Sequence, residues 1–416
     1  MEEERPLYKT ILKNKNIMYY LLGGGVSSLG DILTGLAFVF LAYDLTGSEL
    51  YTTGMVIATT IPYLLFGLVG GVIADWVQKN KLLIMIDIIR IPLILSLVFC
   101  YYFDVLTYTY MIIISFFIQC CGCFFNPAHR ALLPIITPIE QRNMTNSLYD
   151  SVTRGITVLS PFLSILLMKT VGVIHFFTID AITYFISALF LIKMNVTEDV
   201  MDAKKKQVKE VILSLREFWI WMKSNKQITF LFLLTFTMVF MNTWVWKVGL
   251  LVSLGEFTKD SKEVYSVIQG FFGCIVIITN MIIPFIWKKL DLAIYTIASI
   301  IWGIGIFLLG FTFNIPFYFV GVFIVGIGLP LAGLTRVYIL QKLVPKDMLG
   351  RGFSFNAVLL YLADTASLLI FGILSIFVSI NVIFIVCGIG MIIMSVALKF
   401  LVFRRHSVKE ETKLMC

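Results

Sequence analysis

Twelve long apolar runs dominate this sequence of 416 residues and constrain its fold more than any other feature. A helix needs roughly 20 apolar residues to cross about 30 Å of hydrocarbon, whereas the strands of a membrane β-barrel would be shorter and would alternate in polarity. The runs lie near residues 17–43, 52–75, 81–103, 107–128, 146–168, 172–193, 228–250, 264–287, 291–313, 316–338, 354–379 and 381–403. The sequence therefore predicts an all-α integral membrane protein with twelve transmembrane helices.

Composition and charge placement exclude a water-soluble globule and predict the orientation of the helices. Hydrophobic residues make up 59% of the chain and charged residues 14%, whereas a soluble domain is about 25% charged. If both termini are cytoplasmic, 27 of the 33 Lys and Arg residues lie on the cytoplasmic side and four on the other, with Arg90 and Arg154 inside helices. Because basic loops stay in the cytoplasm, we expect this multi-pass topology. The net charge of +8 then reflects topology and contact with anionic lipids, not nucleic-acid binding.

One long polar interval, residues 194–227, divides the twelve runs into two sets of six. We expect residues 1–193 to form an N-terminal six-helix bundle and residues 228–416 a C-terminal six-helix bundle. The interval between them is predicted to be a cytoplasmic linker, in which apolar residues at helical spacing indicate an amphipathic helix on the membrane surface. Similar segments begin at Arg130 and Arg336, 206 residues apart, which indicates an internal duplication of the kind found in transporters.

Signatures of catalysis or metal binding are missing from the sequence. There is no G-x-x-x-x-G-K-[ST] phosphate loop, and the three His residues are far apart along the chain. The cluster Cys120-Cys121-Gly122-Cys123 has no His or carboxylate nearby on its helix, so we interpret it as a set of small packing residues. We expect no enzymatic activity, no cofactor, no resident metal and no disulfide.

Charged residues inside the apolar runs are the main indication of a functional site. Each costs at least about 2.5–3.5 kcal/mol at the centre of a membrane helix, so it usually has a partner or a function. These residues are Asp31, Asp87, Arg90, Arg154, Asp180 and Asp364. Asp87 and Arg90 are three residues apart, so we expect a structural ion pair on one helix face. Arg154 could hold either an anionic substrate or a neighbouring carboxylate, and Asp364 is expected to be structural.

Asp31 and Asp180 are the candidates for proton coupling. At 1.5 Å per residue, Asp31 lies roughly 21 Å from the inner end of its helix and Asp180 about 10 Å below the outer surface, so the two share a similar depth. Neither has a basic residue within one turn of its own helix. A carboxyl group without a counter-ion in a low-dielectric environment favours its protonated form, as a group that exchanges protons requires. The alternative is a hydrogen-bonded packing role, which is favoured for Asp180.

Several motifs resemble those of one transporter family. The segment Gly71-Val-Ile-Ala-Asp75-Trp-Val-Gln-Lys79-Asn-Lys81 resembles the G-x-x-x-D-R-x-G-R-[RK] signature of the major facilitator superfamily, with Trp76 and Gln78 departing from it. Other segments resemble, in the same order, the macrolide-efflux and enterobactin-exporter branch of that family. They are Gly30-Asp31, Tyr43-Asp-Leu-Thr-Gly-Ser48, Asp87-Ile-Ile-Arg90, Asn126-Pro-Ala-His-Arg130 and Ile179-Asp180. Gly155 to Pro161 is similar to the antiporter motif G-x-x-x-G-P, with Ser160 replacing the second glycine.

This resemblance implies two further sets of site residues. The first is a latch that joins the two bundles on the inner side, formed by Gly71, Asp75, Lys79 and Arg130. The second is the wall of a substrate cavity between the bundles. Its candidate residues are Tyr19, Tyr20, Phe38, Phe124, Arg154, Asn242, Trp246 and Tyr338.

The resemblance also implies a function. It predicts a secondary transporter that exports a small amphipathic organic molecule, such as a drug, a macrolide-like compound or a siderophore, by proton antiport with alternating access. We expect it in the bacterial inner membrane, as a monomer whose partners are its small-molecule substrate, protons and membrane lipids. Three alternatives stay open: a lysophospholipid or metabolite carrier, a ferroportin-like divalent-metal transporter, and a non-transporting membrane receptor or assembly factor.

Overall fold

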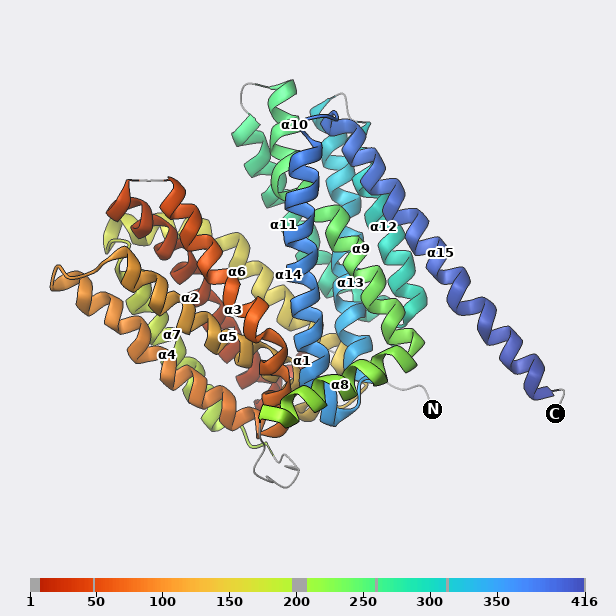
Figure 1. Ribbon diagram of the computed structural model, residues 1–416, viewed down its shortest axis with the longest axis horizontal. Coiled ribbons are helices and arrows are strands. Elements are labelled where there is room, and N and C mark those ends of the chain that lie inside the picture. Colours follow the sequence, from red (N-terminus) through yellow and green to blue (C-terminus); the bar gives the residue numbers. More distant parts are fainter. Residues whose placement is uncertain (1–7, 48, 197–207, 259–260, 312–313, 415–416) are drawn as a thin grey trace. The chain divides into compact units, whose positions relative to one another are not determined.

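The computed structural model describes residues 8–47, 49–196, 208–258, 261–311 and 314–414, which are almost entirely helical (Figure 1). The helices are α1 (Tyr8–Leu12), α2 (Lys15–Thr46), α3 (Glu49–Trp76), α4 (Lys79–Tyr102), α5 (Tyr108–Ile136), α6 (Arg142–Thr170), α7 (His175–Lys193), α8 (Val208–Ser224), α9 (Lys226–Trp244), α10 (Leu250–Phe257), α11 (Ser261–Ile286), α12 (Leu292–Gly310), α13 (Ile315–Leu343), α14 (Leu349–Leu374) and α15 (Ile380–Leu414). A π-helical turn, η1 (Val245–Gly249), joins α9 to α10, and a 3₁₀ turn, η2 (Lys346–Met348), precedes α14.

The predicted membrane spans are present. Within the described residues, eleven helical spans are long and apolar enough to cross a membrane. A twelfth is obtained when α6 is counted across a bend of 50° between its parts Arg142–Ser160 and Phe162–Thr170. Pro161 separates these parts, and a proline inside a helix removes a backbone hydrogen-bond donor and bends the helix. The all-α class with twelve transmembrane helices is confirmed.

Helix α2 carries the central carboxylate of the site, and its sequence explains both of its ends. The Asn14 side chain accepts hydrogen bonds from the backbone N–H groups of Asn16 (3.0 Å) and Ile17 (3.4 Å), which is an N-cap. Gly47 has a φ of 60°, and its N–H donates to the Tyr43 carbonyl at 2.7 Å, which ends the helix. Between these caps α2 runs for 32 residues, with Asp31 at its middle.

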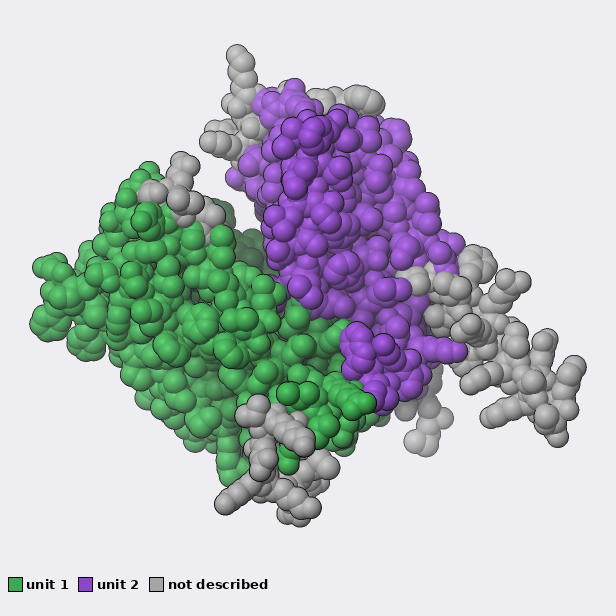
Figure 2. Space-filling model, in the orientation of Figure 1, with its two compact units in different colours: residues 1–218, 344–358 green, residues 219–343, 359–416 purple. Residues whose placement is uncertain are grey.

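Contacts divide the chain into two compact units, coloured separately in Figure 2. The first unit comprises residues 1–218 and 344–358, and the second comprises residues 219–343 and 359–416. In the first unit, α2 packs against α6 and α7, α3 against α5, and α4 against α7. In the second unit, α12 packs against α13 and α15, and α11 against α13. The predicted division into bundles 1–193 and 228–416 stays a prediction.

Candidate functional site

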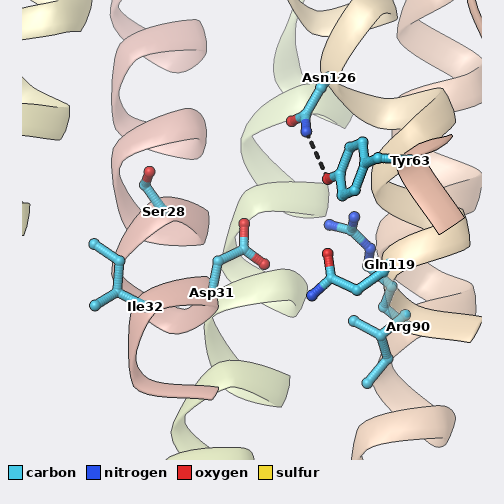
Figure 3. Close-up of a pocket in the computed structure, with 8 residues that line it drawn as sticks. Ser28, Asp31, Ile32, Tyr63, Arg90, Gln119 and Asn126 are labelled. Carbon is cyan, nitrogen blue, oxygen red and sulfur yellow. Dashed lines mark hydrogen bonds between the residues drawn. The ribbon is translucent and has the colours of Figure 1, made fainter. Parts of the chain in front are cut away.

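The first unit contains a polar cavity of about 260 Å³ (Figure 3). It lies among four helices that are apolar overall, yet most of the side chains facing it are polar. The lining residues are Ser28, Asp31 and Ile32 of α2, Tyr63 of α3, Arg90 of α4, and Ile118, Gln119 and Asn126 of α5. Because polar groups are costly at membrane depth, such a concentration of them indicates a site that binds or conducts a polar group.

Asp31 faces this cavity from the middle of α2 and supplies the one carboxylate among the lining residues. Its Oδ1 accepts a hydrogen bond of 2.7 Å from the hydroxyl group of Tyr184 on α7. Figure 3 shows Asp31 and Arg90 on facing sides of the cavity, with no hydrogen bond drawn between them. Asp31 therefore combines a fixed position with access to a polar space, which proton exchange requires.

Asp180 is close to Asp31 but does not line the cavity. It is fully buried and packs against α2 at Gly30 and Thr34, two residues that flank Asp31. The Thr34 hydroxyl donates to Oδ2 of Asp180 at 2.6 Å, and the Thr183 hydroxyl donates to Oδ1 at 3.0 Å. The structure thus brings together the two carboxyl groups that the sequence placed at a similar depth, and it exposes only Asp31 to the cavity.

Gly30 is required for the close approach of α2 and α7. A Cβ atom at this position would overlap with the side chains of Asp180 and Thr183. We expect Gly30→Ala to lower the free energy of unfolding by about 1–3 kcal/mol, the usual cost of overpacking. Gly35 on the same helix has no neighbouring atom within 4 Å of such a Cβ, so Gly35→Ala is the matched control.

Thermal unfolding of the two purified variants in detergent tests this expectation. Gly35→Ala should be neutral or more stable than the parent, because alanine is favoured over glycine inside a helix by about 1 kcal/mol. Equal unfolding midpoints for the two variants would contradict the packing described around Gly30.

Arg90 does not form the predicted structural ion pair with Asp87. Both oxygens of Asp87, and the Nε and Nη1 atoms of Arg90, are buried without a hydrogen-bond partner. The guanidinium carbon lies instead over the rings of Tyr184 and Phe125, 5.1 and 5.2 Å from their centroids. Arg90 lines the polar cavity, whereas Asp87 does not belong to its lining.

Two of the predicted cavity-wall residues, Tyr20 and Phe38, are buried in helix packing in the first unit. Tyr20 stacks on His129 with ring centroids 4.1 Å apart, and Phe38 packs against Phe177 at 5.0 Å. Neither belongs to the lining of the polar cavity. Aromatic side chains fill large volumes between helices, and the local sequence does not distinguish this role from that of a cavity wall.

The other predicted wall residues of the first unit, Tyr19, Phe124 and Arg154, also lie outside that lining. Tyr19 stacks on Phe190 at a centroid distance of 5.9 Å, and Phe124 packs against a cluster of buried apolar residues. Arg154 is exposed on α6. Its role, as a partner of an anionic substrate or of a neighbouring carboxylate, stays a prediction.

Three predicted wall residues belong to the second unit. Asn242 accepts a hydrogen bond of 2.9 Å from the indole N–H of Trp302. Trp246 lies in the π-helical turn and packs on Phe272 at a centroid distance of 4.4 Å, and Tyr338 is buried. The substrate-binding role of these residues is still a prediction.

The second unit also pairs two charges that the sequence left separate. Lys247 lies inside the continuous span Lys226–Glu256. Its Nζ contacts Oδ2 of Asp364 at 3.1 Å, and the Thr243 hydroxyl donates to Oδ1 of the same carboxylate. Lys247 belongs to the π-helical turn Val245–Gly249, and single π turns inside α-helices often occur at functional sites. Sequence periodicity contains no signal for one inserted residue.

Two of the predicted latch residues, Gly71 and Asp75, lie together at the end of α3 beside the start of α14. Asp75 accepts hydrogen bonds from the backbone N–H groups of Gly350 (2.5 Å) and Arg351 (3.0 Å) and from Nε of Arg351 (3.1 Å). A carboxylate here satisfies free N–H groups at a helix N-terminus. Gly71 leaves no room for a Cβ beside Gly350 and Ser354. All of these residues belong to the first unit.

The other two predicted latch residues are placed differently. Arg130 pairs with Asp150 of α6 at 3.4 Å and lies over the ring of Tyr149, with 4.7 Å from its guanidinium carbon to the ring centroid. Lys79, the first residue of α4, is 7% exposed. Sequence reasoning missed Arg351, which is the partner of Asp75.

Up to twelve membrane spans in the described residues, with a polar cavity among four of the helices, are typical of a membrane transport protein. Residues 20–366 match the Major Facilitator Superfamily, and the chain belongs to that family of transporters. This result confirms the resemblance found in the sequence.

Relatives and solved structures agree with this assignment. The chain is 23% identical to the uncharacterised MFS-type transporter YkuC of Bacillus subtilis (strain 168), over 93% of this chain and 91% of the relative. It is 22% identical to macrolide efflux protein A of Streptococcus pyogenes, over 86% and 89% of the two chains. The fold is similar to that of a bacterial homologue of the iron transporter ferroportin in an outward-facing state, with a TM-score of 0.73 and 14% identity over 92% and 98% of the chains.

Proposed function

We propose that this protein exports a small amphipathic organic molecule, such as a drug, a macrolide-like compound or a siderophore, across the bacterial inner membrane by proton antiport. The observation that carries the proposal is the carboxylate of Asp31, hydrogen-bonded to Tyr184 and facing a polar cavity in the middle of a membrane span. Similarity to macrolide efflux protein A supports the direction and the class of cargo.

In this mechanism Asp31 binds a proton from the outer side and releases it to the cytoplasm, and cargo moves the other way. Tyr184 donates a hydrogen bond that holds the Asp31 carboxylate in place, and the fully buried Asp180 lies nearby on the same helix as Tyr184. One proton moving down a gradient equivalent to 100 mV releases about 2.3 kcal/mol, which supports roughly a fifty-fold concentration ratio of cargo.

The proposal includes the latch predicted from the sequence. Its support is the contact of Asp75 with the first turn of α14, in which the ion pair with Arg351 is almost completely buried. Such a contact at the inner end of α3 can form and break as access to the cavity alternates. Lys79 and Arg130 are proposed to stabilise the neighbouring helix ends.

Uptake of radiolabelled erythromycin into inverted membrane vesicles tests the function. Vesicles that contain the protein and have an acidic interior should accumulate erythromycin. Collapse of the pH gradient by nigericin should reduce uptake at least about ten-fold, because one proton supports a concentration ratio of erythromycin of roughly fifty. Vesicles without the protein are the control. Uptake that is independent of the gradient would contradict proton antiport even if transport itself persists.

The alternatives predict different results in a thermal stabilisation screen. Stabilisation by lysophospholipids would favour the lipid carrier, and stabilisation by divalent metals that is lost in Asp31→Ala would favour the metal transporter. In the ranges that the structure describes, no group of three or more His, Cys, Asp or Glu residues is placed to hold a metal ion. No observation on those residues therefore favours the metal alternative.

A further inference from the structure

Opposite charges face one another across the polar cavity without forming an ion pair. Asp31 extends into it from α2 and Arg90 from α4 (Figure 3). Oδ1 of Asp31 is bonded to the Tyr184 hydroxyl, and the described ion pairs do not include Asp31 with Arg90. A carboxylate and a guanidinium held apart by a cavity can both be satisfied by one molecule that lies between them.

Two hydrogen-bond donors of Arg90 are unsatisfied, although its charge interacts with the carboxyl groups of Asp31 and Asp87. Its side chain is 4% exposed, and Nε and Nη1 have no hydrogen-bond acceptor. The rings of Tyr184 and Phe125 lie over the guanidinium group and stabilise its positive charge. They do not accept hydrogen bonds from the N–H groups that point outward in the plane of the guanidinium. A carboxylate is the group that matches the planar donors of a guanidinium.

The remaining lining residues select for a small polar group. Ser28, Tyr63, Gln119 and Asn126 supply hydroxyl and amide groups, and Asn126 already donates to the Tyr63 hydroxyl at 2.9 Å. The apolar part of the lining is limited to Ile32 and Ile118. The volume of about 260 Å³ is below the range of about 300–1,000 Å³ typical of sites that enclose a whole drug. The cavity fits a compact polar group with a short apolar attachment.

We infer that this cavity binds a zwitterion, with its ammonium group on Asp31 and its carboxylate on Arg90. The inference rests on the proposed function and adds to its cargo amphipathic molecules that carry both charges close together, whereas a cargo with an amine alone, such as erythromycin, engages only Asp31. The ammonium group of the zwitterion then pairs with the Asp31 carboxylate, which the exchanged proton otherwise neutralises. Arg90 binds the carboxylate of the zwitterion and takes no part in proton exchange.

A matched set of three probes tests the inference on the purified full-length protein in detergent. Phenylalanine carries both charges, its methyl ester lacks the carboxylate, and N-acetylphenylalanine lacks the ammonium group. Binding is measured from the increase of the unfolding temperature with ligand concentration. We expect phenylalanine to bind at least about ten-fold more tightly than either analogue, since each analogue loses one charge-assisted interaction.

Variants assign each charge to its residue. In Asp31→Asn, phenylalanine and N-acetylphenylalanine should bind equally while the preference over the ester persists. In Arg90→Gln, phenylalanine and the ester should bind equally while the preference over N-acetylphenylalanine persists. If Arg90→Gln does not fold, Arg90→Lys keeps the charge and should reduce the preference over the ester without removing it. Asp44→Asn and Lys169→Gln, at exposed positions, are the matched controls and should keep both preferences.

Two results would overturn the inference. One is equal binding of phenylalanine and either analogue to the parent protein, and the other is failure of all three probes to bind. Neither result depends on transport, so this test and the erythromycin test fail independently. Discrimination among the probes without pH-driven uptake would refute the antiport alone, and pH-driven uptake without discrimination would refute the zwitterion alone.

Discussion

Asp31→Asn is expected to remove the dependence of transport on the pH gradient while leaving the protein folded. Asparagine has nearly the same shape and can still accept the Tyr184 hydrogen bond, but it cannot bind and release a proton. For one proton exchanged across a gradient equivalent to 100 mV, the parent should accumulate erythromycin roughly fifty-fold in inverted vesicles. In Asp31→Asn the ratio of inside to outside concentration should fall to near unity. Exchange of labelled for unlabelled cargo at equal concentrations requires no proton, so it should persist.

Two other carboxyl groups of the first unit, those of Asp44 and Asp180, provide the comparisons. Asp44→Asn changes an exposed carboxylate on the same helix and should accumulate cargo like the parent. Asp180→Asn alters a fully buried group bonded to Thr34 and Thr183, so its main effect should be a lower unfolding temperature. Parent-level accumulation by Asp31→Asn would show that the coupling proton binds elsewhere.

The fold was predictable because it follows from composition averaged over long segments. Twelve apolar runs, one polar interval and the distribution of Lys and Arg are properties of many residues, so single exceptions do not alter the result. One such exception is α6, whose bend of 50° beside Pro161 interrupts a run that still predicts a membrane span.

The candidate site was predictable only where a residue stands out from its own helix. Asp31 is an isolated charge in an apolar run, and the sequence identified it for that reason. Arg90 also lies at membrane depth, but Asp87 three residues earlier provided a plausible local partner. Whether Arg90 turns to Asp87 or to the cavity is decided by the packing of α4 against α5 and α7, which no pattern within one helix reports.

Aromatic packing and helix register also limit what the sequence alone predicts about the site. Tyr20 and Phe38 have the residue types of a cavity wall, yet contacts with His129 and Phe177 bury them. Lys247, which pairs with Asp364, lies in the π-helical turn at Val245–Gly249. Both outcomes depend on contacts between residues far apart in the sequence, so they require a structure.

Asp75→Ala is expected to be the most destabilising single change where the end of α3 contacts the start of α14. Asp75 and Arg351 form an ion pair in which the two side chains are 1% and 5% exposed. Removal of one partner of a buried pair leaves the other charge uncompensated and costs about 3–5 kcal/mol. The substitution also leaves the N–H groups of Gly350 and Arg351 without their acceptor. The measurement is the thermal unfolding midpoint of the purified variant in detergent.

Glu217 provides the comparison, because it contacts the same arginine from α8 at 3.5 Å but is 64% exposed. An exposed ion pair contributes less than about 1 kcal/mol, so Glu217→Ala should unfold close to the parent. Asp75→Asn retains an acceptor oxygen for one backbone N–H and should fall between the two. If Asp75→Ala unfolds no earlier than Glu217→Ala, then the contact between α3 and the first turn of α14 contributes little to stability, and the latch proposed on it loses its physical basis.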